Sequence, residues 1–364
     1  MQRVSRLPRW RFTVVCIVPA AAAVGLFLGG PWSWLGVAVY GLLYLAWDGL
    51  GPRDVTPPLA EGGRLLDGLL FIQVPLVLLA WLGLLAAFSA SRATALDLVG
   101  ASASFALAVT VAGTITAHEL VHRTGSAISL FAGRLLLAFI FDAAFSIEHV
   151  HGHHTRVATA EDPATARRGE SLYRFIGRST AQSFRSAWQI EARRLRRAGH
   201  KLWSWRNRNL RGIGLSLVLV LATLGAAGPL AMAAFILYCA YAKAMLEVTN
   251  YIEHYGLVRV PGTRIAARHS WDTAAPISAA GMFNLGRHAS HHVAARPYWT
   301  LALESDSPKL PNGLVISGLI AAIPPLWRRK MARRLARWDR EQATEAERAL
   351  AGAAERAIAA PAPA

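Results

Sequence analysis

The sequence contains little cysteine and little charge. Only Cys16 and Cys239 occur in its 364 residues, and both lie inside apolar runs. Two isolated cysteines exclude a disulfide framework and any cysteine-ligated iron–sulfur centre within this sequence. Charged residues make up 17% of the chain and hydrophobic residues 54%, which argues against a soluble protein of two or three domains.

The sequence contains several long runs of apolar residues. Several approach or reach the length of about 20 residues that a helix needs to cross a bilayer. The expected spans are Phe12–Gly29, Trp32–Trp47, Leu66–Phe88, Leu96–Ala117, Ile213–Ala227 and Leu230–Asn250. A further run, Leu130–Phe145, contains Arg134 and Asp142 and is expected to form a re-entrant or interfacial helix. The sequence therefore predicts an all-α integral membrane protein with a six-helix transmembrane bundle.

The distribution of lysine and arginine predicts the orientation of these spans, because short loops rich in both residues stay in the cytoplasm. The N-terminal tail, the link after the second span and the long segment after the fourth span carry several arginines. The links after the first and fifth spans, near Pro31 and Pro229, carry none, and the link after the third carries only Arg92. Both termini are therefore expected in the cytoplasm.

The formal net charge of +17 does not indicate a nucleic-acid partner. The basic residues lie in the expected cytoplasmic segments, where they suit anionic lipid headgroups. The densest segment, Arg193–Arg211, also contains Trp203 and Trp205. Basic and aromatic residues together favour a helix at the membrane interface. A docking patch for an acidic protein is the alternative, and the two roles are compatible.

Histidine is concentrated in four motifs. These are HELVH ending at His122, HVHGHH ending at His154, NYIEHYG around His254, and RHASHH ending at His292. Neutral imidazole is a common ligand for iron, copper, zinc and nickel. Nine of the twelve histidines occupy ligand-like positions in these motifs, which is too many for one ion and suits two. The candidate metal ligands are His118, His122, His149, His153, His154, His254, His288, His291 and His292.

The spacing within the second motif predicts how its histidines are shared. Residues four apart lie on one face of a helix, so His149 and His153 are expected to face one ion. His154 is rotated by about 100° from His153, toward a neighbouring site. Since all four motifs follow or end expected spans at the cytoplasmic side, the histidines are expected to form a cytoplasmic cap on the bundle.

Three acidic residues are candidates for hydrogen bonds to imidazole N–H groups. Glu148 and Glu253 each precede a motif histidine, and Asp162 follows the second motif. A carboxylate in such a position orients a metal-bound imidazole. Asp162 precedes a proline, so a turn or a helix cap is an equally good interpretation. His269, which has no spaced partner, is expected either to support a ligand or to be structural.

Two other functions fit parts of the pattern. HELVH matches H-E-x-x-H of zinc metalloproteases, in which Glu119 would be the general base. Such a protease needs one further ligand, whereas this chain offers seven more histidines. A histidine-rich metal transporter is the non-enzyme alternative. Transport sites lie near the bilayer midplane, and the motifs here are expected at one membrane face.

The ordered motifs resemble those of the membrane-bound non-haem di-iron family of fatty-acid desaturases and hydroxylases. Within that family they are most similar to bacterial alkane 1-monooxygenases. The resemblance rests on HELVH, EHVHGHHTRVATAEDPATARRGE, NYIEHYG and RHASHH, and it extends from the first span to about Lys330. Three departures occur at positions other than ligands. His151 stands where Arg or another polar residue is expected, Ala160 replaces Pro, and Ser290 replaces Asp.

The resemblance implies an O₂-dependent enzyme that converts medium-to-long alkanes to 1-alkanols. It implies that the nine histidines bind two iron ions, and that rubredoxin and rubredoxin reductase supply electrons. It also implies a multi-pass protein of the bacterial inner membrane that takes its hydrophobic substrate from the bilayer. Hydroxylation of methyl groups on aromatic rings and fatty-acyl desaturation or hydroxylation remain as alternatives, and the oligomeric state is left open.

Two regions are expected along the chain. Residues 1–330 form the membrane di-iron hydroxylase domain of the desaturase type. Residues 331–364 form a cytoplasmic C-terminal helix followed by a disordered tail, because the last segment is rich in alanine and proline.

Reporter fusions test the predicted orientation. A reporter that is active only in the periplasm should be active when fused after Gly228 and inactive when fused after Arg259, because the link between the last two spans carries no positive charge. A cytoplasmic reporter should give the reverse pattern. The opposite result for both reporters would place the histidine motifs outside the cytoplasm.

Overall fold

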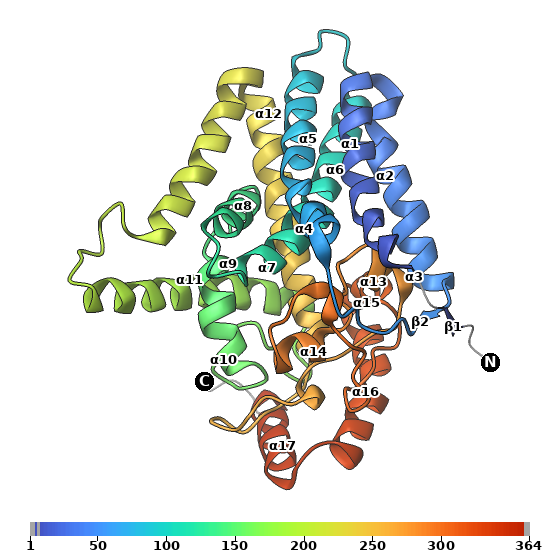
Figure 1. Cartoon of the computed structure of the whole chain (residues 1–364), viewed down its shortest axis with the longest axis vertical. Helices are drawn as coiled ribbons and strands as arrows, with labels where there is room; N and C mark the ends of the chain where they lie inside the picture. The colour runs from blue at the N-terminus through green and yellow to red at the C-terminus, as the bar shows by residue number, and fades with distance from the viewer. Residues whose placement is uncertain (1–3, 6–7, 360–364) are drawn as a thin grey trace.

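A computed structural model of the chain describes residues 4–5 and 8–359 and shows a predominantly helical protein (Figure 1). Within the described part, the only strands are β1 Val4–Ser5 and β2 Arg53–Asp54, which pair in parallel. Arg3 and Arg6 of the basic N-terminal tail lie outside the described residues. Most of the C-terminal segment that was expected to be disordered belongs to helix α17, Glu345–Ala359, and residues 360–364 lie outside the described part.

Four helical segments are long and apolar enough to cross a membrane. They form the upper bundle in Figure 1. Their bounds are Arg9–Leu28 (η1 Arg9–Cys16 and α1 Ile17–Leu28), Gly63–Ser89 (α4 Gly63–Phe71 and α5 Gln73–Ser89), Ala95–Val121 (α6 Ala95–Ala108, η4 Val109–Thr114 and α7 Ile115–Val121) and α12 Arg208–His254. The expectation of an all-α membrane protein is thus met by these helices.

Helix α12 contains the fifth and sixth expected spans. Its 47 residues would make a straight helix of about 70 Å, more than twice the hydrocarbon thickness of a bilayer. The backbone turns sharply at Gly228, where φ is 82° and ψ is −179°. Such a positive φ favours glycine, and Pro229 starts the next arm with a fixed φ. The two arms form the hairpin at the upper left of Figure 1.

The second expected span is an irregular helical segment. It is composed of η2 Gly30–Trp34, α2 Leu35–Tyr40, the π-helical turn η3 Gly41–Leu45, and α3 Ala46–Leu50. Ser104 of α6 fixes its start, because the Ser104 hydroxyl donates to Ser33 O at 2.6 Å and accepts from Val37 N at 3.3 Å. Gly36 permits this close approach, since a Cβ there would lie 2.9 Å from the Cβ of Ser104.

Helix α8, Ala127–Ala138, is apolar but has only 12 residues. At 1.5 Å per residue it is about 18 Å long, too short to cross a bilayer. Ser126 caps its first turn by accepting a hydrogen bond from Ser129 N. The helix covers only the first part of the expected run Leu130–Phe145, and its re-entrant or interfacial placement stays a prediction.

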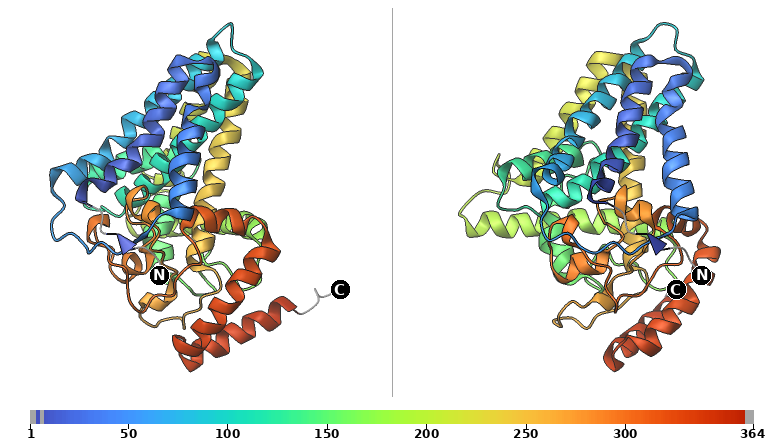
Figure 2. Two further views of the ribbon diagram at one scale, coloured as in Figure 1. Left: turned by 90° about the vertical axis from the view of Figure 1, so that its right-hand side faces the viewer. Right: turned by 45° about the vertical axis from the view of Figure 1, so that its right-hand side comes forward.

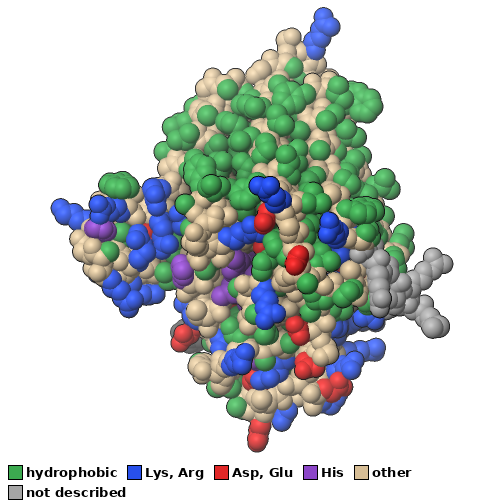
Figure 3. Space-filling model, in the orientation of Figure 1, with side chains coloured by type: hydrophobic (Ala, Val, Ile, Leu, Met, Phe, Trp, Pro, Cys, Tyr) green, Lys and Arg blue, Asp and Glu red, His purple; other side chains and the backbone are tan. Residues whose placement is uncertain are grey.

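Helix α11, Leu172–Arg197, lies across the lower end of the bundle (Figure 1). Basic side chains cover its outer end in Figure 3, below the hydrophobic surface of the bundle. The buried carboxylate of Glu191 joins α11 to the start of α12, because it accepts from Arg194 at 2.7 Å and from Arg208 at 2.7 Å. Burial alone would raise the pKa of Glu191, but these hydrogen bonds lower it to about 2. The carboxylate is therefore ionised.

The remaining elements pack beneath the bundle, and Figure 2 shows them at the end opposite the α5–α6 link. They are α9 Phe145–Glu148, η5 His149–His153, α10 His154–Arg156, η6 Ala267–His269, α13 Pro276–Ala280, α14 His288–Val293, η7 Tyr298–Thr300, α15 Leu314–Ala321, α16 Pro324–Glu341 and α17. Helix α16 is anchored by its buried face, which includes Trp327 and Trp338, and by an ion pair between Arg168 and Asp339 at 2.6 Å.

Replacing Glu191 with alanine should destabilise the protein. The change leaves the guanidinium groups of Arg194 and Arg208 without their buried partner, and the expected loss in unfolding free energy is about 2 kcal/mol. The measurement is the melting temperature of the detergent-solubilised protein. Glu341→Ala is the matched control, because Glu341 is itself exposed and its ion-pair partner in the described part of the chain is the exposed Arg337. Equal melting temperatures for the two variants would contradict this role of Glu191.

Candidate metal centre

All nine candidate ligands meet at the lower end of the bundle. His118 and His122 end the third span, and His254 ends α12. The second motif forms the short helical segment η5–α10, and the fourth forms α14. The fold therefore joins two span ends and two short helices, which are far apart in sequence, around one buried volume.

The nine side chains form two groups. In the first, one ring nitrogen from each residue lies within 4.8 Å of all the others. Neighbouring Nε2 atoms are closer still, at 3.0 Å between His122 and His149 and 3.2 Å between His149 and His154. The members of this first group are His118, His122, His149, His154 and His291.

The second group has the same geometry. His288 Nε2 lies 3.0 Å from both His254 Nε2 and His292 Nε2. His292 Nε2 also lies 3.2 Å from His153 Nε2. The members are His153, His254, His288 and His292, and all four are buried.

The expected sharing of the second motif was wrong. His149 and His154 belong to the first group, and His153 belongs to the second. The reason is that residues His149–His153 form a π-helical turn, in which residues five apart, not four, are bonded across one turn. The other two motifs follow α-helical spacing, since His118 with His122 and His288 with His292 are each four apart within one group.

The separations within each group suit ligands of a metal ion. An imidazole nitrogen lies about 2.1 Å from a bound first-row metal, so two ligands at right angles are about 3 Å apart. The observed Nε2 separations of neighbours are 3.0–3.2 Å. His118 Nε2 is buried and has no hydrogen-bond partner among the described residues. A metal ion satisfies such converging nitrogen atoms better than hydrogen bonds, because a neutral imidazole has one N–H.

Burial favours the neutral form of these rings, except at His153, where the neighbouring Asp162 outweighs burial and raises the pKa. Burial lowers the pKa of His122 to about 4, with a further contribution from His153. Burial, followed by repulsion from neighbouring imidazoles, also holds other ring pKa values well below their ordinary value, namely those of His149, His154, His288, His291 and His292. A neutral ring keeps the lone pair that a metal requires.

Asp162 orients the ring of His153 through Nδ1, the ring nitrogen that does not face the second group. Its Oδ2 lies 2.9 Å from His153 Nδ1, which places the proton on Nδ1 and leaves Nε2 for the second group. Burial would raise the pKa of Asp162, but the contact with His153 lowers it. Asp162 also accepts from Ala164 N and from the hydroxyl of Thr165. Both interpretations of this residue, turn formation and imidazole support, therefore hold together.

The other two acidic candidates differ. Glu148 accepts from Arg156 at 2.8 Å and from Ser186 at 3.3 Å, and not from a histidine of the described part. Glu253 Oε2 lies 3.3 Å from His288 Nε2, on the side where the second group converges. Its Oε1 is buried without a partner among the described residues. The carboxylate of Glu253 is thus close enough to the second group to bind the same metal ion as its histidines.

A small cavity lies between the two groups. Its volume is about 30 Å³, and it is bordered by His118 and His149 of the first group and His288 of the second. The rest of its lining is mostly apolar or uncharged, namely Thr114, Ile115, Phe145, Leu246, Thr249, Asn250, Glu253 and Leu285. The site therefore presents an apolar space directly beside the histidines.

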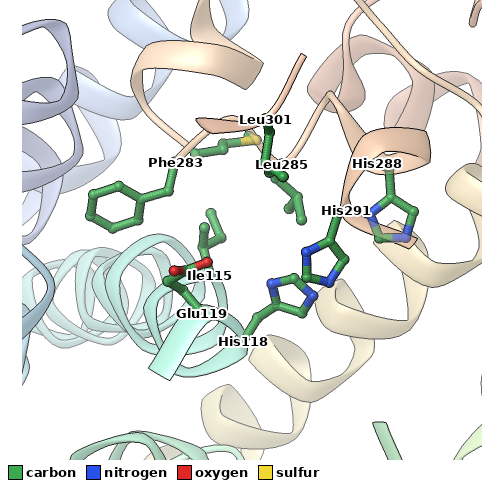
Figure 4. Close-up of a pocket in the computed structure, with 9 residues that line it drawn as sticks. Ile115, His118, Glu119, Phe283, Leu285, His288, His291 and Leu301 are labelled. Carbon is green, nitrogen blue, oxygen red and sulfur yellow. The ribbon is translucent and has the colours of Figure 1, made fainter. Parts of the chain in front are cut away.

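Glu119 is a site residue that its motif alone did not place. Figure 4 shows it beside His118, in a smaller cavity that Phe283, Leu285 and Leu301 help to line. Its carboxylate is 3.7 Å from Arg123, and it accepts from Tyr298 N at 3.4 Å. The protease interpretation made Glu119 a base next to one zinc ion. The observed contacts make it a link between the third span and the segment after α14.

Helix α14 is held by residues that the sequence did not mark as functional. Asp272 accepts from Ala289 N at 2.8 Å and from Ser307, which caps the first turn of α14. Arg287 is buried and donates to Leu301 O and to Asp54. These contacts fix the three histidines of α14 relative to both neighbouring segments.

The remaining histidines lie outside both groups. His151 is exposed, and the ring of His200 lies beside Arg206. His269 is buried, with Nε2 at 2.8 Å from Glu347 of α17 and Nδ1 accepting from Ala266 N. This assigns His269 a structural role.

The buried charges of α12 form a triplet. Lys243 contacts Glu247 and also Asp142, the latter at 2.6 Å. Asn250, which lines the cavity, donates to Glu247 at 3.3 Å. The contact between Lys243 and Asp142 joins the last span to the segment after α8.

Comparison with known proteins gives consistent matches. The sequence profile of the fatty acid desaturase family matches residues 93–311, which include all nine histidines. Alkane 1-monooxygenase 1 of Pseudomonas aeruginosa is 40% identical over 225 residues, which are 60% of this chain and 59% of that protein. Alkane 1-monooxygenase 2 of the same species is 34% identical over 319 residues, 82% of this chain and 83% of that protein.

A relative with a different name matches almost the full length. The xylene/toluene monooxygenase hydroxylase component XylM of Pseudomonas putida is 31% identical over 358 residues, which are 94% of each chain.

Alanine substitutions test the two histidine groups. Replacing His154 or His292 should each lower the bound metal per chain by at least half, because each change removes one ligand from one of the two groups. Metal content is measured on the purified protein by elemental analysis. His200→Ala is the control and should bind the wild-type amount. Full metal content in both group variants would contradict the two-group assignment.

Proposed function

Because the chain belongs to the fatty acid desaturase family, we propose that it is a membrane monooxygenase that hydroxylates the terminal carbon of medium-to-long alkanes. The observation that carries this proposal is the pair of histidine groups beside an apolar cavity. The alkane 1-monooxygenases among its relatives support the reaction type.

The two groups are proposed to hold one iron ion each. Five imidazoles would bind the first ion and four the second, with Glu253 next to the second group. When bound, an iron pair supplies the redox chemistry with O₂ that an unactivated C–H bond requires and that zinc lacks. The protein contributes neutral ligands, fixed ring orientations through contacts such as that of Asp162, and exclusion of water by burial.

The cavity positions the substrate. Ile115, Phe145, Leu246 and Leu285 offer apolar contacts next to His118, where a methyl group binds without the cost of burying a polar group. No charged substrate group is required for this contact. The outer surface of the bundle is apolar (Figure 3). A hydrophobic substrate dissolved in the bilayer would approach the cavity along this surface.

The membrane arrangement follows from the helices. We propose six crossings, made by the four apolar segments, the second arm of α12 and the segment 30–50. The histidine cap and both termini face the cytoplasm of a bacterium, in its inner membrane. Residues 1–330 form the hydroxylase domain, and residues 331–364 follow it as a C-terminal extension. Rubredoxin and its reductase are the proposed electron donors, because this sequence has no cysteine-ligated centre.

A second candidate is hydroxylation of a methyl group on an aromatic ring. The length of the match to the xylene/toluene monooxygenase component favours it. A methyl-substituted aromatic ring is wider than a linear alkane. The residues that line the cavity would therefore determine which of the two substrates is preferred.

Whole-cell product analysis tests the function. Cells that express the chain with rubredoxin and its reductase are fed a series of linear alkanes and, separately, methyl-substituted arenes. The expected products are 1-alkanols, and His288→Ala should abolish them while His200→Ala should not. Benzylic alcohols without 1-alkanols would favour the second candidate. Absence of any hydroxylated product with full expression would contradict both.

Enlarging the cavity tests the substrate position. Leu285 lines both cavities that His288 borders. Leu285→Ala removes three carbon atoms from this lining, and a difference of a single methylene group changes discrimination by about 1–3 kcal/mol. The ratio of benzylic to alkanol product should therefore rise at least about tenfold. Leu237→Ala is the control, because Leu237 is exposed on the outer face of α12. An unchanged ratio in Leu285→Ala, with activity retained, would remove Leu285 from the substrate cavity.

A further inference from the structure

A cavity away from the histidines lies between helix α16 and the loop before α15. Its volume is about 450 Å³. The lining residues are Pro311, Asn312, Leu326, Arg329, Lys330, Arg333 and Arg334. We call this space the α16 groove.

The groove carries uncompensated positive charge. Its four basic residues are spaced so that Arg329 and Arg333, like Lys330 and Arg334, are four apart and share one side of the helix. None of the four forms an ion pair with another described residue, whereas Arg337 of the same helix pairs with Glu341. Four neighbouring cations that lack acidic partners favour an anionic ligand.

The position of the groove in the fold indicates that it lies at the membrane surface. The side chains of Leu319 and Ile323, at the end of α15, are 56% and 55% exposed. The end of α15 is tied to the transverse helix α11, because the hydroxyl of Tyr173 donates to Ala322 O at 2.7 Å. Its start is tied to the bundle, because Asp48 accepts from Ile316 N at 2.8 Å. The exposed apolar residues are therefore held at the depth of α11.

Distance along α16 places the cations just beyond that level. Arg329 is six residues after Ile323, about 9 Å along a helix. Helices at an interface bury their apolar side chains about 5–10 Å into the headgroup region. The cations then lie where lipid phosphates are found, and Figure 2 shows α16 running away from the bundle from this point.

We propose that the α16 groove binds the phosphate headgroup of an anionic phospholipid, with the acyl chains against Leu319 and Ile323. Exposed apolar side chains next to the cations suit acyl chains, and an acidic protein would not need them. Basic pockets on the cytoplasmic side of membrane proteins bind such headgroups. This inference is independent of the reaction at the histidine groups.

A lipid bound in the groove would press the opposite face of α16 against the third histidine motif. Trp327 packs against Tyr251 and Tyr255 of the third histidine motif, with ring centroids 5.8 and 5.5 Å apart. Leu335 lies against Gly256, where an added Cβ would approach it to 3.0 Å. The headgroup therefore holds α16 against the segment that carries His254, and its binding should raise the stability of the protein.

The test compares two double variants of the full-length protein in nanodiscs. Both Arg329→Gln/Arg333→Gln and Arg328→Gln/Arg340→Gln remove two positive charges from α16, but only the first pair lines the groove. Phosphatidylcholine discs receive graded amounts of phosphatidylglycerol, and bound phosphatidylglycerol is measured by native mass spectrometry together with the melting temperature. The groove variant should bind phosphatidylglycerol about tenfold more weakly and lose the rise in melting temperature. The control pair should behave as wild type.

Further arms of the experiment separate the alternatives. Arg329→Lys/Arg333→Lys should keep the response, because it keeps the charge. Equal losses in the two glutamine variants would overturn the proposal in favour of diffuse surface charge. Saturation by inorganic phosphate in pure phosphatidylcholine discs would make the groove a site for free phosphate. Unchanged lipid binding with a raised KM for an acidic electron-donor protein would make it a protein-docking surface, and would also overturn the proposal.

Discussion

Nine imidazole rings converge in one buried volume, and the surrounding structure depends on keeping them there. A buried imidazole without a partner is unfavourable, so each group must be satisfied from within. The 3.0–3.2 Å separations between neighbouring nitrogen atoms leave room for one ion per group. The ends of two spans and two short helices are fixed around this volume by Asp162, Asp272 and Arg287. None of these three side chains belongs to either group: Asp162 orients the ring of His153, and Asp272 and Arg287 hold helix α14 in place.

The membrane part supplies the rigid frame for these rings. The third apolar segment and α12 each end in histidines of the two groups, so these helices set the position of the site. The break at Gly228 turns the second arm of α12 back toward the histidines, and the buried Glu191 fixes the start of its first arm. Helix α16 closes the site from the opposite side through Trp327 and Leu335.

Hydrophobicity and motif order were enough to predict the class of fold and the set of clustered histidines. Apolar runs mark spans because every such helix must match the same bilayer thickness. The division of the histidines between groups was not predictable from spacing, since the π-helical turn at His149–His153 depends on packing around it. The joining of the fifth and sixth expected spans in helix α12 and the role of Glu119 also depend on contacts between residues distant in sequence. Asp272 and Arg287 carry no local pattern, because their partners are 17 and 233 residues away.

The central claim is that the chain builds two separate iron sites from one set of histidines. Anomalous diffraction at the iron absorption edge, from crystals of protein purified with its metal, locates iron directly. The account predicts two iron peaks, one among His118, His122, His149, His154 and His291 and the other among His153, His254, His288 and His292. A single peak, or a signal only at the zinc edge, would contradict it.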